Sequence, residues 1–194
     1  MRGEGPTVKK TLKVDKFRGF SLGVPANVYL SKGKQKVEVK GQKNIIANIE
    51  TDVRKGYWKI EFDKNVRNMK DLEIYISLPS FDRLAIAGSG SVVGEDTFNN
   101  LSDLKVSIAG SGDIELEGSA ADLEVSIAGS GDVNLKDLKA DNCDISIAGS
   151  GDCEIHVSED LKVSIAGSGD VKYKGNPNKV KSSIAGSGDV RSFD

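Results

Sequence analysis

Five aspartates recur at the same place in a short glycine–serine motif, and together they are the residues that most resemble a ligand set. Each closes a copy of SIAGSGD, and the five are Asp113, Asp132, Asp152, Asp170 and Asp189. Carboxylate oxygens suit Ca²⁺, which makes this set a weak candidate metal site. The alternative is that each carboxylate points into water and accepts hydrogen bonds from turn N–H groups or a serine hydroxyl. We favour the alternative and therefore expect no cofactor.

The two cysteines and the single histidine are the other residues with reactive side chains. Cys143 and Cys153 occupy slots that hydrophobic residues fill in the neighbouring copies, so we expect both to pack in the core. His156 lies on the outward register of a strand, where a nucleophilic site would need partners from another repeat. A strand follows each GSG, whereas phosphate-binding loops of this kind precede a helix. The sequence therefore predicts no catalytic residue.

A repeat positions all of these residues. The pentapeptide IAGSG begins at Ile86, Ile108, Ile127, Ile147, Ile165 and Ile184, with spacings of 22, 19, 20, 18 and 19 residues. The first copy has Ser91 where the other five have aspartate. A period near 19 is too short for a propeller blade and too rich in β-formers for helical repeats, but it suits one coil of a β-helix. The predicted fold is an all-β parallel β-helix with six GSG rungs.

Alternation within each copy assigns an inside and an outside to the coil. In the second copy, one parity holds Leu104, Val106, Ile108, Gly110 and Gly112, and the other holds Lys105, Ser107, Ala109, Ser111 and Asp113. Side chains of one parity share one face of a strand, so the six isoleucines should form one buried column. The glycines should lie where the coil needs close approach or an unusual φ. Aspartates of successive rungs would repel by about 0.9 kcal/mol per pair in water.

The outward parity also predicts a flat strip of small side chains. Its serines are Ser107, Ser111, Ser126, Ser130, Ser146, Ser150, Ser164 and Ser168, with alanines between them. Such a strip could dock a second copy, the N-terminal strands or a ligand. The alternative is that nothing docks and that small residues simply suit the bend.

Charge divides the chain into two unlike parts. Residues 1–80 carry 17 basic and 9 acidic side chains, a net charge of +8, whereas residues 81–194 carry 10 and 20, a net charge of −10. The basic residues are scattered through alternating segments, so we expect solvated strand faces and no nucleic-acid partner. Opposite charges on the two parts make a homo-oligomer a reasonable expectation.

The final rung has few residues after it. The last IAGSG ends six residues before Asp194, so apart from Phe193 we expect little of the chain to cover the apolar side chains of that rung.

The N-terminal part lacks the repeat but is also rich in alternating segments. We expect residues 1–80 to form strands that cap or continue the helix formed by residues 81–194. No stretch approaches the roughly 20 apolar residues of a transmembrane helix. The first residues lack the apolar core of a signal peptide, so we expect any native export signal to lie outside this sequence.

The GSG repeat together with its lead-in resembles a known family. The lead-in reads VDKFRGFSLGVPANVYLSKG, then VEVKGQKNIIANIETDV, then IYISLP at residues 74–79. In this order it is similar to the head GIN domain family of auto-transporter adhesins, over almost the whole chain. The resemblance implies an exported bacterial envelope protein with a right-handed β-helix similar to that of pectin lyases but without their catalytic residues. It implies no functional positions to carry over.

We therefore expect a non-catalytic binding or adhesion protein of the cell envelope, periplasmic or surface-exposed, that presents a flat β-helical surface to a glycan or an envelope protein. One alternative is a polysaccharide-active enzyme with an acidic Ca²⁺-binding face. That activity needs a local cluster of carboxylates with an Arg or Lys base in a groove, whereas these aspartates are evenly spaced. The other alternative is a scaffold that only self-assembles.

Overall fold

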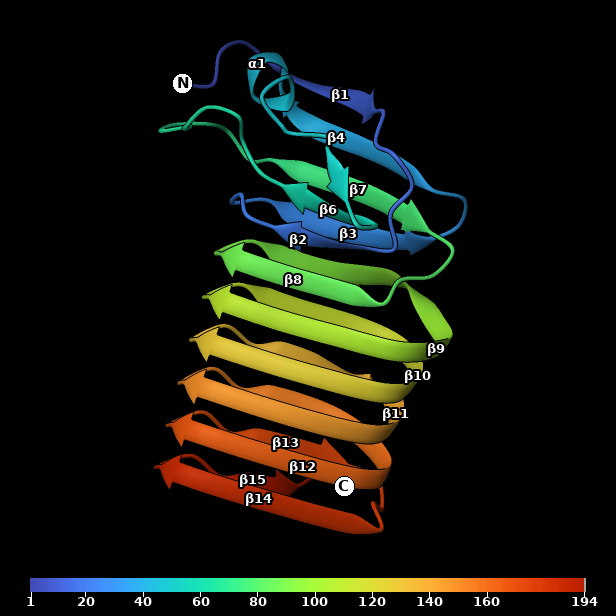
Figure 1. Cartoon of the computed structure of the whole chain (residues 1–194). Helices are drawn as coiled ribbons and strands as arrows, with labels where there is room; N and C mark the ends of the chain where they lie inside the picture. Colours follow the sequence, from blue (N-terminus) through green and yellow to red (C-terminus); the bar gives the residue numbers. More distant parts are fainter. Residues whose placement is uncertain (194) are drawn as a thin grey trace.

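The computed structural model describes residues 1–193 as a long coil of strands with one short helix (Figure 1). The elements are β1 (Thr7–Leu12), β2 (Gly19–Leu22), β3 (Asn27–Lys32), β4 (Lys36–Gln42), α1 (Lys43–Ile46), β5 (Val53–Arg54), β6 (Tyr57–Ile60), β7 (Glu73–Leu78), β8 (Arg83–Gly88), β9 (Ser91–Gly110), β10 (Asp113–Gly129), β11 (Val133–Gly149), β12 (Cys153–Gly167), β13 (Val171–Lys174), β14 (Lys179–Gly186) and β15 (Val190–Ser192). A search of these residues for a helix long and apolar enough to cross a membrane finds none.

All fifteen strands belong to one hydrogen-bonded sheet that winds around the core. In Figure 1 the strands nearest the viewer run leftward as the coil descends towards the C-terminus, and those behind run rightward, which is a right-handed winding. We call the near side the front face: β2, β6, β8, β14 and the second halves of β9 to β12. The far side, the rear face, holds β3, β7, β13, β15 and the first halves of β9 to β12. The predicted right-handed parallel β-helix is confirmed.

Successive rungs of the front face pair in parallel with equivalent residues side by side. The ladder aligns Ile86 with Ile108, and then Ile127, Ile147 and Ile165 in turn. These five side chains are at most 3% exposed, so the predicted column of isoleucines forms the core. The expectation that Ile184 completes it is wrong, because Ile184 is 40% exposed. Its strand, β14, pairs with β12 on one side only, and within residues 1–193 no strand covers the other side.

Glycine is required at the corner between the front and rear strands because the backbones of neighbouring rungs nearly touch there. Gly110 has φ +139°, and a Cβ on it would lie 2.2 Å from the carbonyl oxygen of Gly88. A Cβ on Gly112 would lie 2.4 Å from the carbonyl oxygen of Gly90. Real side chains do not tolerate such distances. The prediction of close approach or an unusual φ is therefore confirmed, with close approach at both positions and a positive φ at Gly110.

The N-terminal strands join the coil out of chain order. Strand β2 lies in parallel between β6 and β8, and β3 lies in parallel between β7 and β9. The rung made by β2 and β3 comes first in the sequence, but in space it lies second from the N-terminal end, after the rung made by β6 and β7. Beyond β7, strands β4 and β1 add antiparallel, and α1 buries Ile45 and Ile46 at this end. The boundary that the sequence predicts near residue 80 falls between β7 and β8, and the division of the chain into these two parts stays a prediction.

Candidate functional site

The front face carries the strip of small side chains. The ladder places Ser107, Ser126, Ser146 and Ser164 in one column, which Ala85 and Ser21 extend towards the N-terminal end. Ser111, Ser130, Ser150 and Ser168 lie at the corner, exposed, and Ser107 and Ser164 are half-buried. The alanines between the two columns are exposed as well. We call this surface the serine strip.

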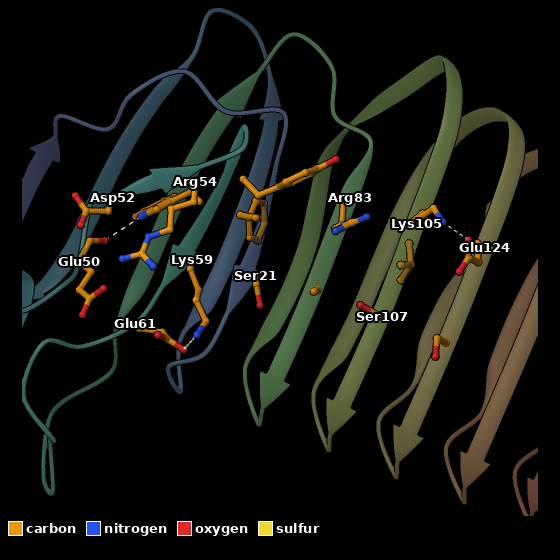
Figure 2. A pocket seen from close by; sticks show the side chains of 16 residues that line it. Ser21, Glu50, Asp52, Arg54, Lys59, Glu61, Arg83, Lys105, Ser107 and Glu124 are labelled. Atoms are coloured by element: carbon orange, nitrogen blue, oxygen red, sulfur yellow. Dashed lines mark hydrogen bonds and ion pairs between the residues drawn. The ribbon is translucent and has the colours of Figure 1, made fainter.

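A groove of about 630 Å³ opens where the serine strip meets the β5–β6 hairpin (Figure 2). Its lining includes the strip residues Ser21, Ser107 and Ser126. Acidic and basic side chains also line it: Glu50, Asp52, Arg54, Lys59 and Glu61 from the N-terminal part, and Arg83, Lys105 and Glu124 from the coil. Apolar and aromatic residues complete the lining: Phe20, Tyr57, Trp58, Ala85 and Val106. The groove therefore joins the two parts of the sequence that differ in charge.

Four of the charged side chains that line the groove form two ion pairs. Lys105 Nζ lies 2.5 Å from Glu124 Oε2, and Lys59 Nζ lies 2.7 Å from Glu61 Oε1. Each lysine holds its partner carboxylate beside the groove, where charged groups can hydrogen-bond to a ligand. Surface pairs of this kind contribute only about 0–1 kcal/mol to stability. Their main effect is to present charges of both signs beside the serine hydroxyls.

Tyr57 connects the hairpin to the coil. Two guanidinium groups contact its ring, with Arg18 Cζ 4.9 Å and Arg83 Cζ 4.6 Å from the ring centroid. Asp82 forms an ion pair with Arg18, with Nη1 3.1 Å from Oδ2, and accepts a hydrogen bond from the Tyr57 hydroxyl at 3.4 Å. Cation–π contacts of this type are worth about 0.5–1 kcal/mol each at exposed sites. Tyr57 therefore links the hairpin to Arg18 and Arg83 and forms part of the groove wall.

The recurrent aspartates form a hydrogen-bonded ladder along the outside of the coil. Asp132, Asp152, Asp170 and Asp189 each donate their backbone N–H to the Oδ1 of the preceding aspartate, at 3.3, 2.9, 2.8 and 2.9 Å. The last carboxylate, of Asp189, accepts from the N–H of Val190 at 2.9 Å. These bonds are of the turn type that the sequence analysis favoured. The column also runs on to Ser91, whose hydroxyl donates to Asn27 Oδ1 at 2.9 Å.

Metal binding by this column stays a prediction. Among residues 1–193, no group of three or more His, Cys, Asp or Glu side chains is arranged to hold a metal ion. One oxygen of each of the five carboxylates already accepts a backbone N–H. A divalent ion would have to use the remaining oxygens, which face solvent.

Replacing Asp132 separates the hydrogen bond from the charge. Asp132→Ala removes both the charge and the acceptor for the Asp152 N–H, and loss of this hydrogen bond should make it about 0.5–1.5 kcal/mol less stable than Asp132→Asn. Asp132→Asn keeps an acceptor oxygen and removes repulsion of about 0.9 kcal/mol with each neighbour, so its stability should equal or exceed that of the parent. Urea melts of the two variants measure the difference, and equal destabilisation by both would contradict this role of the ladder.

Both cysteines are core residues, as the repeat predicts. Cys143 pairs in register with Leu123 and Leu161, and Cys153 pairs with Val133 and Val171. They are free thiols, 4% and 0% exposed. Burial raises the pKa of both thiols well above the ordinary value, so neither provides a nucleophilic thiolate at neutral pH.

His156 lies half-buried on the outward side of the rear face, as predicted. In the ladder its neighbours are Lys139 on one side and Lys174 on the other. The ladder therefore places a basic residue beside His156 in each of the two neighbouring rungs.

Comparison with known proteins decides the family. A family model described as "Putative auto-transporter adhesin, head GIN domain" matches residues 16–177. The chain belongs to this family. The resemblance drawn from the GSG repeat and its lead-in is therefore confirmed. No curated protein matches the chain.

Solved structures show the same fold as this head GIN domain protein. A structure titled putative adhesin from Bacteroides fragilis is 24% identical with a TM-score of 0.79, and each chain covers 100% of the other. A structure titled putative lipid binding protein from Parabacteroides distasonis is 20% identical with a TM-score of 0.67, covering 100% of this chain and 99% of its own. A structure titled putative adhesin from Parabacteroides merdae is 18% identical with a TM-score of 0.59, with the same coverage.

Sequence reasoning missed the groove of this GIN domain protein. The repeat identified Ser107 and Ser126 but gave no reason to place Glu50, Asp52 or Tyr57 beside them. In the sequence these three residues lie in a non-repetitive segment between two strand-like stretches, and no motif marks them as part of a site. Its position depends on β6 pairing above β2, which the order of the chain does not suggest.

A second cluster of polar and aromatic residues lies on the rear face of the N-terminal rungs. Tyr29 and Tyr75 stack with their ring centroids 5.2 Å apart, and Lys9 Nζ lies 4.6 Å from the Tyr75 ring centroid. The Tyr75 hydroxyl donates to Glu73, which also pairs with Lys40 at 2.9 Å. These contacts lower the pKa of Glu73, the Tyr75 hydrogen bond most, and the bond to Glu73 raises the pKa of Tyr75 to about 12.

We expect one of the four tyrosines to titrate late in an ultraviolet absorbance titration, near pH 12. Because the folded pKa is raised, the stabilisation is complete below pH 10 and is lost as the pH rises from 10 to about 12. Glu73 behaves oppositely: its contribution is present above pH 4.5 and is lost as the pH falls through its lowered pKa. Glu73→Gln should bring the late tyrosine back towards pH 10, and an unchanged titration would contradict the assignment.

Proposed function

We propose that this protein is a non-catalytic binding protein of the bacterial cell envelope and that it adheres through its front face. Membership of a family described as adhesins supports this role, as does the shared fold of structures titled adhesins. The observation that carries the proposal is the continuous, outward-facing serine strip with the charged groove at its N-terminal end.

The front face suits an extended polar ligand. Small side chains let a second flat surface approach the backbone closely, and serine hydroxyls both donate and accept hydrogen bonds. The groove adds cations and carboxylates within reach of the strip. An envelope glycan chain or an extended segment of an envelope protein has the length and polarity to lie along several rungs. Both belong to the periplasm or the cell surface, which is the location that we propose.

Enzymatic cleavage of a polysaccharide is the less favoured function. The groove contains Glu50, Asp52, Glu61 and Glu124 beside Arg54 and Arg83, which is closer to the cluster such an enzyme needs than the aspartate column is. Glu61 and Glu124 each form an ion pair with a lysine, an arrangement suited to holding a polar ligand, and this favours binding. The Ca²⁺ dependence that this alternative implies would appear as a melting temperature that rises with the logarithm of Ca²⁺ concentration. We expect no difference between chelator and millimolar Ca²⁺.

A binding screen tests the proposal. The labelled protein is applied to an array of bacterial glycans and to separated envelope proteins, and the same glycans are assayed for newly released reducing ends. We expect saturable binding to at least one envelope component with no release. Release of sugar ends would support the enzyme, and no binding to any envelope component would overturn the proposed function.

A further inference from the structure

The outer edge of the last rung is where the hydrophobic interior of this coil lies open. Within residues 1–193, β14 pairs only with β12 and β15 pairs only with β13. Val180 and Ile184 of β14 are 41% and 40% exposed, whereas the residues in register with them on β12, Leu161 and Ile165, are 2% and 3% exposed. An unpaired strand edge flanked by open core side chains is a template for a further strand.

The sequence of β14 is complementary to itself in antiparallel pairing. With Ser182 opposite the same residue of a second copy, Val180 lies opposite the second copy's Ile184. Lys181 then lies opposite a serine and Lys179 opposite an alanine. This register keeps every inward side chain on the inside, because antiparallel pairs face the same way. It also places the hydroxyl of Ser182 opposite the same hydroxyl of the second copy, and cross-strand serine pairs of this kind can form a hydrogen bond.

The N-terminal end offers no equivalent edge for head-to-tail stacking. On the front face β5 adds antiparallel beside β6, and on the rear face β4 and β1 add antiparallel beyond β7. The strands at this end therefore differ in direction and side chains from the rung that β14 would continue. Pairing of β14 with itself gives the free edge of β14 a partner in both copies, and a closed two-fold interface of this kind is the commonest in soluble oligomers.

We propose that two copies of this chain associate tail to tail through β14, about a two-fold axis at Ser182. The two copies of Lys181 then lie diagonally across the pair, about 7–8 Å apart, and repel each other. Salt screens this repulsion, so dimerisation should strengthen as salt is added. Association through the opposite charges of the two parts of the chain would weaken under the same conditions.

Light scattering across protein and salt concentrations tests the association. We expect the mass to rise from 20.7 kDa to twice that value with protein concentration, at lower concentration in 1 M salt than in 20 mM salt. Ile184→Lys should remain monomeric, and it should fold because Ile184 is already 40% exposed. Ser130→Lys adds the same charge on the serine strip away from β14 and should dimerise like the parent.

Crosslinking tests the register independently of folding effects at Ile184. Ser182→Cys should form a disulfide-linked dimer on mild oxidation, whereas Ala185→Cys should stay largely monomeric on a non-reducing gel. The native cysteines are at most 4% exposed and can stay in both variants. A strictly monomeric mass at every concentration and salt, a dimer that survives Ile184→Lys, or crosslinking of Ala185→Cys equal to that of Ser182→Cys would each overturn the proposal.

Discussion

Ile147→Ala is expected to lower the free energy of unfolding by about 2–5 kcal/mol. Ile147 is 1% exposed and lies between Ile127 and Ile165 in the buried column. Truncation there removes buried methyl and methylene groups and leaves a cavity that neighbouring rungs cannot fill, because their backbones are fixed by parallel pairing on both sides. Urea melts give the value.

The same substitution at Ile184 is the matched control. Ile184 occupies the same slot of the repeat but is 40% exposed, so Ile184→Ala should cost less than about 0.5 kcal/mol, the usual range for surface sites. Both melts are run at low protein concentration to keep the chain monomeric. An equal decrease in the free energy of unfolding at the two positions would contradict this account. It would mean that the inward direction of the side chain alone, and not coverage by a following rung, determines the effect.

Gly149→Ala is expected to destabilise the protein severely, by about 1–3 kcal/mol for backbone strain and about 1–3 kcal/mol or more for overpacking. Gly149 has φ +137°, and a Cβ there would lie 2.1 Å from the carbonyl oxygen of Gly129. The clash is with backbone, so rotation of a side chain cannot relieve it. Neighbouring rungs would have to separate at the corner.

Gly88→Ala isolates the contribution of stacking. Gly88 has a similar φ of +128°, yet a Cβ on it would meet nothing within 4 Å. The two variants therefore share the backbone strain and differ in the clash between rungs. Gly149→Ala should melt at clearly lower urea concentration than Gly88→Ala, and coincident melting curves would argue against close contact of the glycine corners.

The repeat made most of the coil predictable because a parallel ladder turns sequence spacing directly into spatial neighbours. Once IAGSG fixed the register, parity assigned Ile108 to the inside and Ser107 to the outside, and both assignments hold. Parity could not show that Ile184 is open, because burial in a coil also requires a following rung. That information lies in the pairing of β14 and not in its own residues.

The candidate site was predictable only in part for a related reason. The serine strip and the aspartate ladder repeat with the coil, so their positions follow from the register. The ladder's continuation to Asn27, and in register to Glu73, did not follow, because these strands carry no recognisable motif. The groove depends on β6 pairing beside β2, a contact between segments that the chain order separates and that periodicity cannot encode.

Adhesion through the front face is tested most directly by comparing one substitution on each face. Ser126→Lys places a long cation in the serine strip beside the groove, and Asn134→Lys adds the same charge and size on the rear face. Binding of both variants and the parent to isolated bacterial envelope fragments is measured by sedimentation at increasing protein concentration. We predict at least tenfold weaker binding for Ser126→Lys and parental binding for Asn134→Lys. Parental binding by Ser126→Lys with loss of binding by Asn134→Lys would contradict the assignment of the front face.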